Sequence, residues 1–307
     1  MNLQAKSLWR LLRQSVEYWL GRQAAIYAGA LAFFTLFSIA PVVILAVQVI
    51  GLVLSTDVAM AQILSHLEGA MGAEAAEAVR NAVARTEITH TSLLPTLISL
   101  GTMVIGATTV FAQLQRSLNS IWDVTPRPNR NTVLELIRNR FLSLTIVLSI
   151  GFVLLVSLLL SVILRAVMAF AADWLPMPDA LAVGLETTVS LLVIGLLFAT
   201  MFKVLPDVKL RWRDVLPGAL LTSVLFALGR SLIAVYLSNT ATASTYGAAG
   251  SLVLLLLWVY YSSLILLFGA AFTRAYTEFR GREVQPVASA VRVERLLVDE
   301  TQPEQNA

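Results

Sequence analysis

The amino-acid sequence predicts an all-α, polytopic membrane protein with six transmembrane helices and with both termini in the cytoplasm. Three observations lead to this prediction. Apolar residues make up 57% of the 307 residues and charged residues only 13%, whereas a soluble domain has about a quarter charged residues. The apolar residues gather in runs long enough to cross a bilayer, and the basic residues gather in alternate connections between these runs.

Each predicted span is an apolar stretch at least as long as the roughly 20 residues that cross a hydrocarbon core. The six spans cover approximately residues 24–54, 93–115, 141–168, 180–202, 215–237 and 248–272, within one membrane domain over 23–275. The first run resembles a secretory signal because basic residues precede it. However, it contains no charge from residue 23 to 56 and no A-x-A cleavage pattern closes it, so we predict a membrane helix.

The orientation follows from the basic residues, because Lys and Arg near span ends stay on the cytoplasmic side. Eighteen of the 22 Lys and Arg residues lie before the first span, in the second and fourth connections, or after the last span. We therefore predict a multi-pass membrane protein with both termini on the cytoplasmic side. This orientation accounts for the net charge of +3, which is then no indication of nucleic-acid binding.

The first 22 residues predict a cytoplasmic amphipathic helix that lies in the membrane interface. Its apolar face consists of Leu8, Leu12, Val16, Trp19 and Leu20, and its polar face of Lys6, Arg10, Arg13 and Glu17. Membrane anchoring is the simpler interpretation of this pattern, and binding of a partner is the alternative. At the other end of the chain, the polar residues 276–307 predict a cytoplasmic tail that is partly disordered.

The external connection at 55–92 is too long for a turn and predicts a helical cap between the first two spans. Apolar residues recur at helical spacing from Met60 to Met71, and an alanine-rich stretch follows Gly72. Two short helices would therefore cover the outer face, either as a moving lid or as a static cap. His66 and His90 lie 24 positions apart in this connection without any cysteine, so we expect no metal site and no cofactor.

Three ionisable residues lie at membrane depth, where a charge is costly and is a functional candidate by default. Arg165, Glu186 and Arg230 fall at similar depth in the outer half of their spans. They would form either an anion or headgroup site, or a Glu186–Arg230 ion pair with Arg165 extending outward. Pro41 interrupts the first span and releases the carbonyl of Phe37, which hydroxyls such as that of Ser38 can satisfy. This candidate helix break is compatible with a substrate site or with an ordinary kink.

Four strings, at residues 30–41, 106–124, 203–220 and 246–276, resemble the YihY/BrkB family of bacterial inner-membrane proteins, some of which carry the historical label ribonuclease BN. The resemblance implies a six-helix inner-membrane protein. The residues that match the family motifs are Asn119, Trp122, Pro206, Pro217, Tyr246, Gly247, Gly250, Trp258, Tyr260 and Gly269. Two positions depart from the family: Ala227 and Ala271 stand where members commonly have carboxylates. Proton transfer through those carboxylates is therefore not expected, and Glu186 is the remaining buried candidate.

No catalytic centre is visible in the sequence. A metal-dependent ribonuclease would need a cluster of His and Asp ligands, and two separated histidines do not supply one. We therefore predict no enzyme activity. Two hypotheses remain: a transporter or export factor for an anionic or amphiphilic envelope compound, or a structural scaffold in the membrane. The expected partners are the lipid bilayer and, for a transporter, a lipid or anionic small molecule.

Overall fold

The computed structural model describes residues 3–51, 55–71, 73–84, 93–127, 179–239 and 250–294. These residues form eight helices and two short strands. The helices are α1 (Leu3–Gly21), α2 (Ala24–Gly51), α3 (Thr56–Met71), α4 (Ala73–Ala84), α5 (Leu93–Ile121), α7 (Asp179–Val204), α8 (Trp212–Asn239) and α10 (Gly250–Phe279). The strands are β1 (Val124–Pro126) and β2 (Ala290–Arg292). The predicted third span, 141–168, lies outside the described residues.

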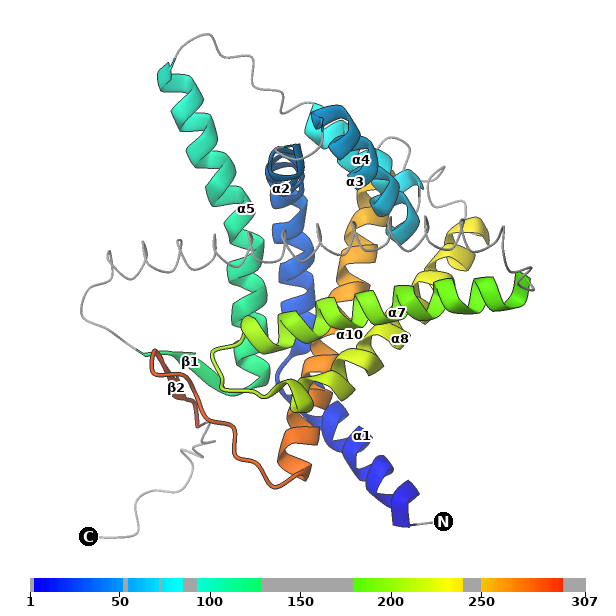
Figure 1. The fold of residues 1–307 in the computed structure, drawn as a ribbon. Coiled ribbons are helices and arrows are strands. Elements are labelled where there is room, and N and C mark those ends of the chain that lie inside the picture. The colour runs from blue at the N-terminus through cyan, green and yellow to red at the C-terminus, as the bar shows by residue number, and fades with distance from the viewer. Residues whose placement is uncertain are drawn as a thin grey trace.

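The long helices form two groups that cross each other. Helices α2, α5 and α10 run roughly along one direction, and α7 and α8 lie side by side across them (Figure 1). Helix α1 and residues 280–294 lie at one end of this bundle, which we call the termini-side end, whereas α3 and α4 lie at the opposite, cap-side end (Figure 1). Among the described residues, three stretches are long and apolar enough to cross a membrane: Ala24–Gln48, Trp212–Ile233 and Leu252–Phe279. The count of six spans and the cytoplasmic side of the termini stay predictions.

The predicted cap is present as two helices. Helix α3 packs on α2, and α4 packs on both α2 and α10. Ala59 of α3 and Val79 of α4 are fully buried in a cluster with Val43, Val47 and Leu255. The two amphipathic patterns read from the sequence thus bury one face each against the long helices. The external side of the cap and its movement stay predictions.

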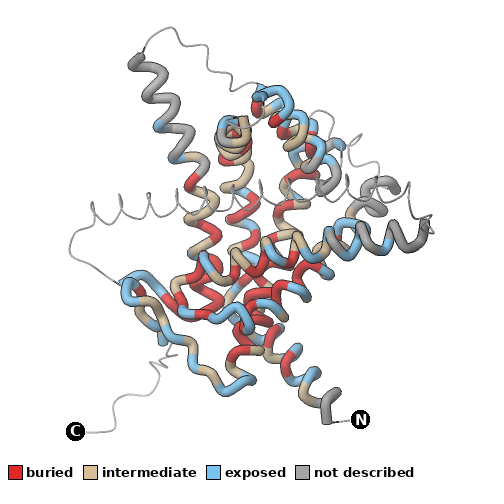
Figure 2. Tube along the Cα trace, viewed as in Figure 1, coloured by how far each residue is buried: buried red, intermediate tan, exposed pale blue. Residues whose placement is uncertain are grey.

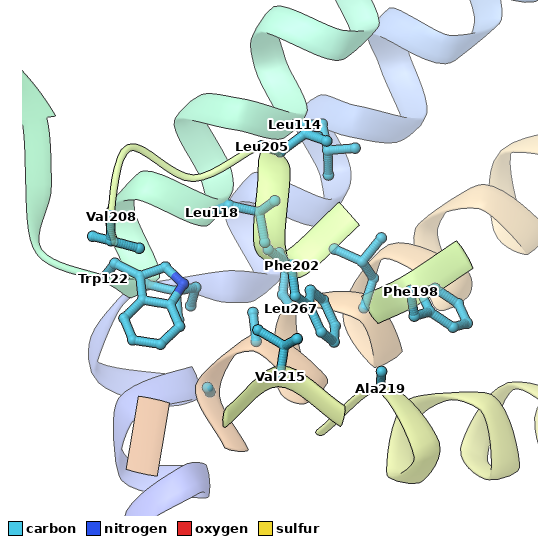
Figure 3. Close-up of a cluster of buried hydrophobic side chains, with 14 of the residues drawn as sticks. Leu114, Leu118, Trp122, Phe198, Phe202, Leu205, Val208, Val215, Ala219 and Leu267 are labelled. Carbon is cyan, nitrogen blue, oxygen red and sulfur yellow. The ribbon is translucent and has the colours of Figure 1, made fainter. Parts of the chain in front are cut away.

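The larger core lies at the termini-side end, where buried residues concentrate (Figure 2). Leu118 of α5, Phe202 of α7, Val215 of α8 and Leu267 of α10 share one buried cluster (Figure 3). Trp122, just after α5, belongs to the same cluster. Phe202, Leu118, Leu267 and Val215 are all almost fully buried. This cluster joins four helices that are far apart in the sequence.

Helices α8 and α10 approach each other closely through two Gly-x-x-x-Thr segments. A Cβ atom on Gly218 would collide with the hydroxyl of Thr273, and one on Gly269 would collide with the hydroxyl of Thr222. Each threonine hydroxyl donates a hydrogen bond to the carbonyl of the glycine four residues earlier, at 2.6 Å in α8 and 2.8 Å in α10. Small residues allow membrane helices to pack closely, and here the arrangement is reciprocal.

A small sheet modifies the all-α prediction. Strand β1 follows α5 and pairs antiparallel with β2, so that Val124 lies opposite Arg292. An isolated bridge also joins Val208 to Pro286. The segment from 282 to 294, which the sequence assigned to a polar tail, therefore runs along the α7–α8 loop and then along β1. The sequence did not predict this pairing, because each strand is only three residues long and its partner lies far away in the sequence.

Candidate functional site

A buried group of charges joins three helix ends at the termini-side end. Asp123, just after α5, accepts a bond from Arg274 of α10 at 2.7 Å and one from Arg22, between α1 and α2, at 2.5 Å. Arg274 also donates to the carbonyl of Ile121 at 2.6 Å. Arg274 and Asp123 are nearly fully buried. We call Arg22, Asp123 and Arg274 the charged hub.

The charged hub extends to α1 through Glu278. Arg274 Nε donates to this carboxylate at 3.0 Å, and the hydroxyl of Tyr18 donates to its other oxygen. The Arg274 guanidinium also lies over the Tyr18 ring, 4.2 Å from its centre, in a cation–π contact. Burial, and then the hydrogen bond to Glu278, raise the pKa of Tyr18 above its ordinary value. Tyr18 is therefore held neutral, as the donor to Glu278.

Two backbone positions beside the hub have a left-handed conformation. Gln23 has a φ of 54° and Asp123 has a φ of 52°. Such values are uncommon for residues other than glycine, and they are least unusual for Asp and Asn. Both residues stand where a helix ends and the chain changes direction, and the Arg22–Asp123 ion pair joins the two places. The hub thus fixes the turn between α1 and α2 relative to the end of α5.

The loop between α7 and α8 is bound to α5 and to the segment after α10. The amide of Asn119 donates to the Asp207 carboxylate at 2.7 Å, and the Asp207 backbone N–H donates to the Asn119 side chain at 2.8 Å. Val287 N–H donates to the Asp207 carbonyl, and Lys209 N–H to the carbonyl of Gln285. Asp214, buried at the start of α8, pairs with Arg282. Hydrogen bonds and ion pairs therefore hold the termini-side end together.

A different kind of site lies between α2 and α10. It is an apolar groove of about 420 Å³, open along one side. Its lining is Gly29, Ala32, Phe33 and Leu36 from α2 and Val253, Leu256, Leu257 and Tyr260 from α10. Gly29 and Ala32 provide the space, because an added Cβ on Gly29 would meet no atom within 4 Å. The groove is mostly open to its surroundings, so a molecule in it would keep one side uncovered. An apolar lining of this kind suits a hydrocarbon chain.

The site that the sequence predicts from Arg165, Glu186 and Arg230 stays a prediction. Arg165 lies outside the described residues, and only the backbone of Glu186 is described, in α7. Arg230 lies in α8 with an exposed side chain. The candidate break at Pro41 lies inside a continuous α2, with Ser38 buried nearby. Pro41 faces α5, since an added Cβ on Gly106 would lie 3.1 Å from its ring.

The described family-motif residues lie at the termini-side end, along α8 and α10, and in the groove. Asn119 and Trp122 lie at the termini-side end, and Pro206 is buried beside Asp207. Gly269 makes the close contact with α8, where Pro217 stands in the first turns, and Tyr260 lines the groove. Trp258 packs edge-on against Phe226, and Gly250 begins α10. Tyr246 and Gly247 lie outside the described residues.

The sequence analysis did not predict the charged hub, although Asp123 and Arg274 lie in the family-like segments 106–124 and 246–276. The available signal was an acidic residue in a connection otherwise rich in arginine. The described residues contain no group of three or more His, Cys, Asp or Glu side chains that could hold a metal ion. The groove offers an apolar surface, and the hub joins helix ends through buried ion pairs.

Comparison with known proteins adds the family context. The family model "Virulence factor BrkB" matches residues 17–293. A "putative ribonuclease-like protein", YfkH of Bacillus subtilis, is 30% identical over 252 residues, which cover 79% of this chain and 86% of that protein. A "UPF0761 membrane protein" of Mannheimia succiniciproducens is 25% identical over 258 residues, covering 82% and 84% of the two chains. Another, from Alteromonas mediterranea, is 27% identical, with 81% of each chain covered. No solved structure matches.

Proposed function

The chain belongs to the virulence factor BrkB family and is a multi-pass bacterial membrane protein, and from this premise we propose that it transports or exports an amphiphilic envelope compound. The observation that carries the proposal is the apolar groove between α2 and α10. A compound with a hydrocarbon chain would place that chain in the groove and keep its polar part outside. The apolar composition of the chain supports the same class of substrate. A groove inside the membrane can be reached by a lipid-soluble molecule directly from the bilayer.

The contrast between the groove and its surroundings supports transport further. The α8–α10 contact and the charged hub fill the termini-side end with close packing and buried bonds. The groove, by comparison, has two small residues on its α2 side, Gly29 and Ala32, and an almost wholly apolar lining. Helices α2 and α10 could separate at the groove while the α8–α10 contact and the charged hub stay fixed. Such a movement would expose a binding site to one side of the membrane at a time.

Filling the groove tests this proposal. Gly29→Leu places a side chain into open space, so the protein should fold and insert normally. The matched control is Gly184→Leu in α7, where an added Cβ also meets no atom within 4 Å and which does not line the groove. Lipids and solutes would be compared in cells with no gene, the wild-type gene and each variant.

We expect Gly29→Leu to reproduce the profile of cells without the gene, and Gly184→Leu to reproduce the wild-type profile, at equal protein levels. A wild-type profile for Gly29→Leu would contradict a role for the groove. It would instead favour the second candidate function, a non-transporting scaffold. That alternative is supported by the densely bonded termini-side end, where α1, the α7–α8 loop and residues 282–294 meet.

Ribonuclease activity is not part of the proposal. The name of the Bacillus relative belongs to that protein, and this chain has only two histidines, 24 positions apart, and no cysteine. Metal-dependent hydrolysis of RNA needs ligands that converge on one ion. Purified protein incubated with labelled RNA and Zn²⁺ or Mn²⁺ should leave the RNA intact. Cleavage that copurifies with the wild-type protein through several columns would overturn this expectation.

A further inference from the structure

Helix α1 presents three different surfaces, not two. The first surface, with Leu11, Ser15 and Tyr18, is turned toward the protein: Leu11 and Ser15 are buried, and Tyr18 bonds to Glu278. The second is an exposed apolar stripe of Leu8, Leu12, Val16 and Leu20, spaced by four residues. The third carries Arg10, Arg13 and Glu17. At 100° per residue, each surface lies about a third of a turn from the next.

The exposed apolar stripe is unusual for a helix that is already held by the protein. Leu8 is 58% exposed and Leu20 is 64% exposed, although both are leucines within an ordered helix. A helix with one side on protein, one apolar and one charged fits the corner between a membrane span and the bilayer surface. The first surface would then contact the protein, the apolar stripe would contact acyl chains, and the charged surface would contact water.

The attachment of α1 to α10 supports lipid as the occupant. The indole of Trp19 donates to the carbonyl of Leu264 at 3.2 Å and contacts the ring of Phe268 edge-on. Both residues lie inside the apolar stretch Leu252–Phe279, which is long enough to cross a membrane. The C-terminal end of α1 therefore lies beside a membrane span, and α2 begins only three residues after α1 ends.

Two exposed tryptophans mark the same boundary. Trp9 is 65% exposed and, by helical geometry, lies where the apolar stripe meets the charged surface. Trp212 is 47% exposed at the start of α8, between the exposed Arg211 and Arg213. Tryptophan is enriched at membrane–water interfaces, and arginines beside it attract anionic headgroups. Both tryptophans belong to elements at the termini-side end (Figure 1).

We propose that α1 docks on the anionic leaflet of the bilayer, with the stripe Leu8, Leu12, Val16 and Leu20 in the headgroup–acyl boundary, while its Leu11–Ser15–Tyr18 surface stays on α10. The inference does not depend on transport. It extends the predicted interfacial helix by assigning a separate surface to the protein and another to the lipid. It also ties the leaflet surface to the charged hub, because Tyr18 and Arg274 contact each other.

Site-specific labelling tests the docking on the full-length protein. The chain has no cysteine, so Leu12→Cys and Val16→Cys each give one labelling site on the stripe, and Glu17→Cys gives a matched site on the charged surface. An environment-sensitive fluorophore on each variant would be quenched either by spin-labelled lipid or by iodide in water. The protein would be held in nanodiscs of phosphatidylcholine, with or without phosphatidylglycerol, at one copy and at two copies per disc.

We expect lipid quenching to be several-fold stronger at Leu12 and Val16 than at Glu17, and iodide quenching to show the opposite order. Phosphatidylglycerol should increase the lipid quenching at the stripe. Equal iodide quenching at all three sites would overturn the docking. Protection of the stripe from both quenchers only when two copies share a disc would overturn it in favour of contact with a second copy. Equal lipid quenching with and without phosphatidylglycerol would overturn the preference for anionic lipid.

Discussion

The termini-side end and the α2–α10 groove are built from opposite kinds of interaction. At the termini-side end, buried charges, reciprocal Gly–Thr contacts and a small sheet join α1, α5, α8 and α10. At the groove, two helices meet through apolar side chains and leave space beside Gly29 and Ala32. Directional bonds fix helices in one arrangement, whereas apolar contacts tolerate sliding. The comparison therefore suggests a rigid end and an adaptable helix pair in the same bundle.

The largest effect should follow from removing a charge from the hub. Arg274→Met leaves Asp123 buried with only Arg22 as its charged partner, and it leaves Glu278 without its bond to Arg274. We expect a loss of about 3 kcal/mol in the free energy of unfolding, the lower end of the range for breaking a buried pair, because Arg22 remains. Denaturant unfolding in detergent would measure it.

The control is Arg13→Met. Arg13 pairs with Glu17 at 2.8 Å, but both side chains are largely exposed, at 73% and 59%. Exposed pairs contribute about 0 to 1 kcal/mol, so this variant should unfold almost like the wild type. If the two variants lose the same stability, the termini-side end is not held by its buried charges and the contrast with the groove is wrong.

A smaller effect separates two glycines in the two regions. Gly269→Leu must push apart α8 and α10, since even a Cβ at this position meets Thr222 and Phe202. Overpacking of this kind typically costs about 1 to 3 kcal/mol. Gly29→Leu enters open space in the groove and should not lower the stability. Thermal unfolding of both variants would measure this difference, and equal losses would show that the groove is as tightly packed as the termini-side end.

The smallest effect concerns pH and the attachment of α1. The pKa of Tyr18 is raised in the folded protein, so its neutral form stabilises the fold below the ordinary tyrosine value of about 10. This contribution should be lost as the pH rises above 10 and Tyr18 ionises beside Glu278. At pH values above about 10, the unfolding midpoint of wild type should therefore fall more steeply with rising pH than that of Tyr18→Phe. Parallel curves would show that the Tyr18–Glu278 bond does not contribute.

Part of the site was recognisable in the sequence and part was not. Asn119, Trp122, Pro206 and Tyr260 were selected as motif residues, and each lies at one of the two sites. The hub was not selected, because its charges were interpreted as markers of membrane orientation. Arg22 and Arg274 do lie on the basic side of the predicted topology, but they also bind Asp123, which is 101 and 151 residues away along the chain. No local pattern specifies such partners.

The sequence by itself determined the helical membrane class and the approximate positions of the long helices. The physical reason is that lipid offers no hydrogen bonds, so each span must be an apolar segment of sufficient length that satisfies its own backbone. Only the tertiary structure decided which polar residues pair, that residues 290–292 return to β1, and that small side chains on α2 leave a groove beside α10. These features depend on contacts between distant segments, and composition and periodicity carry no information about which distant segments meet.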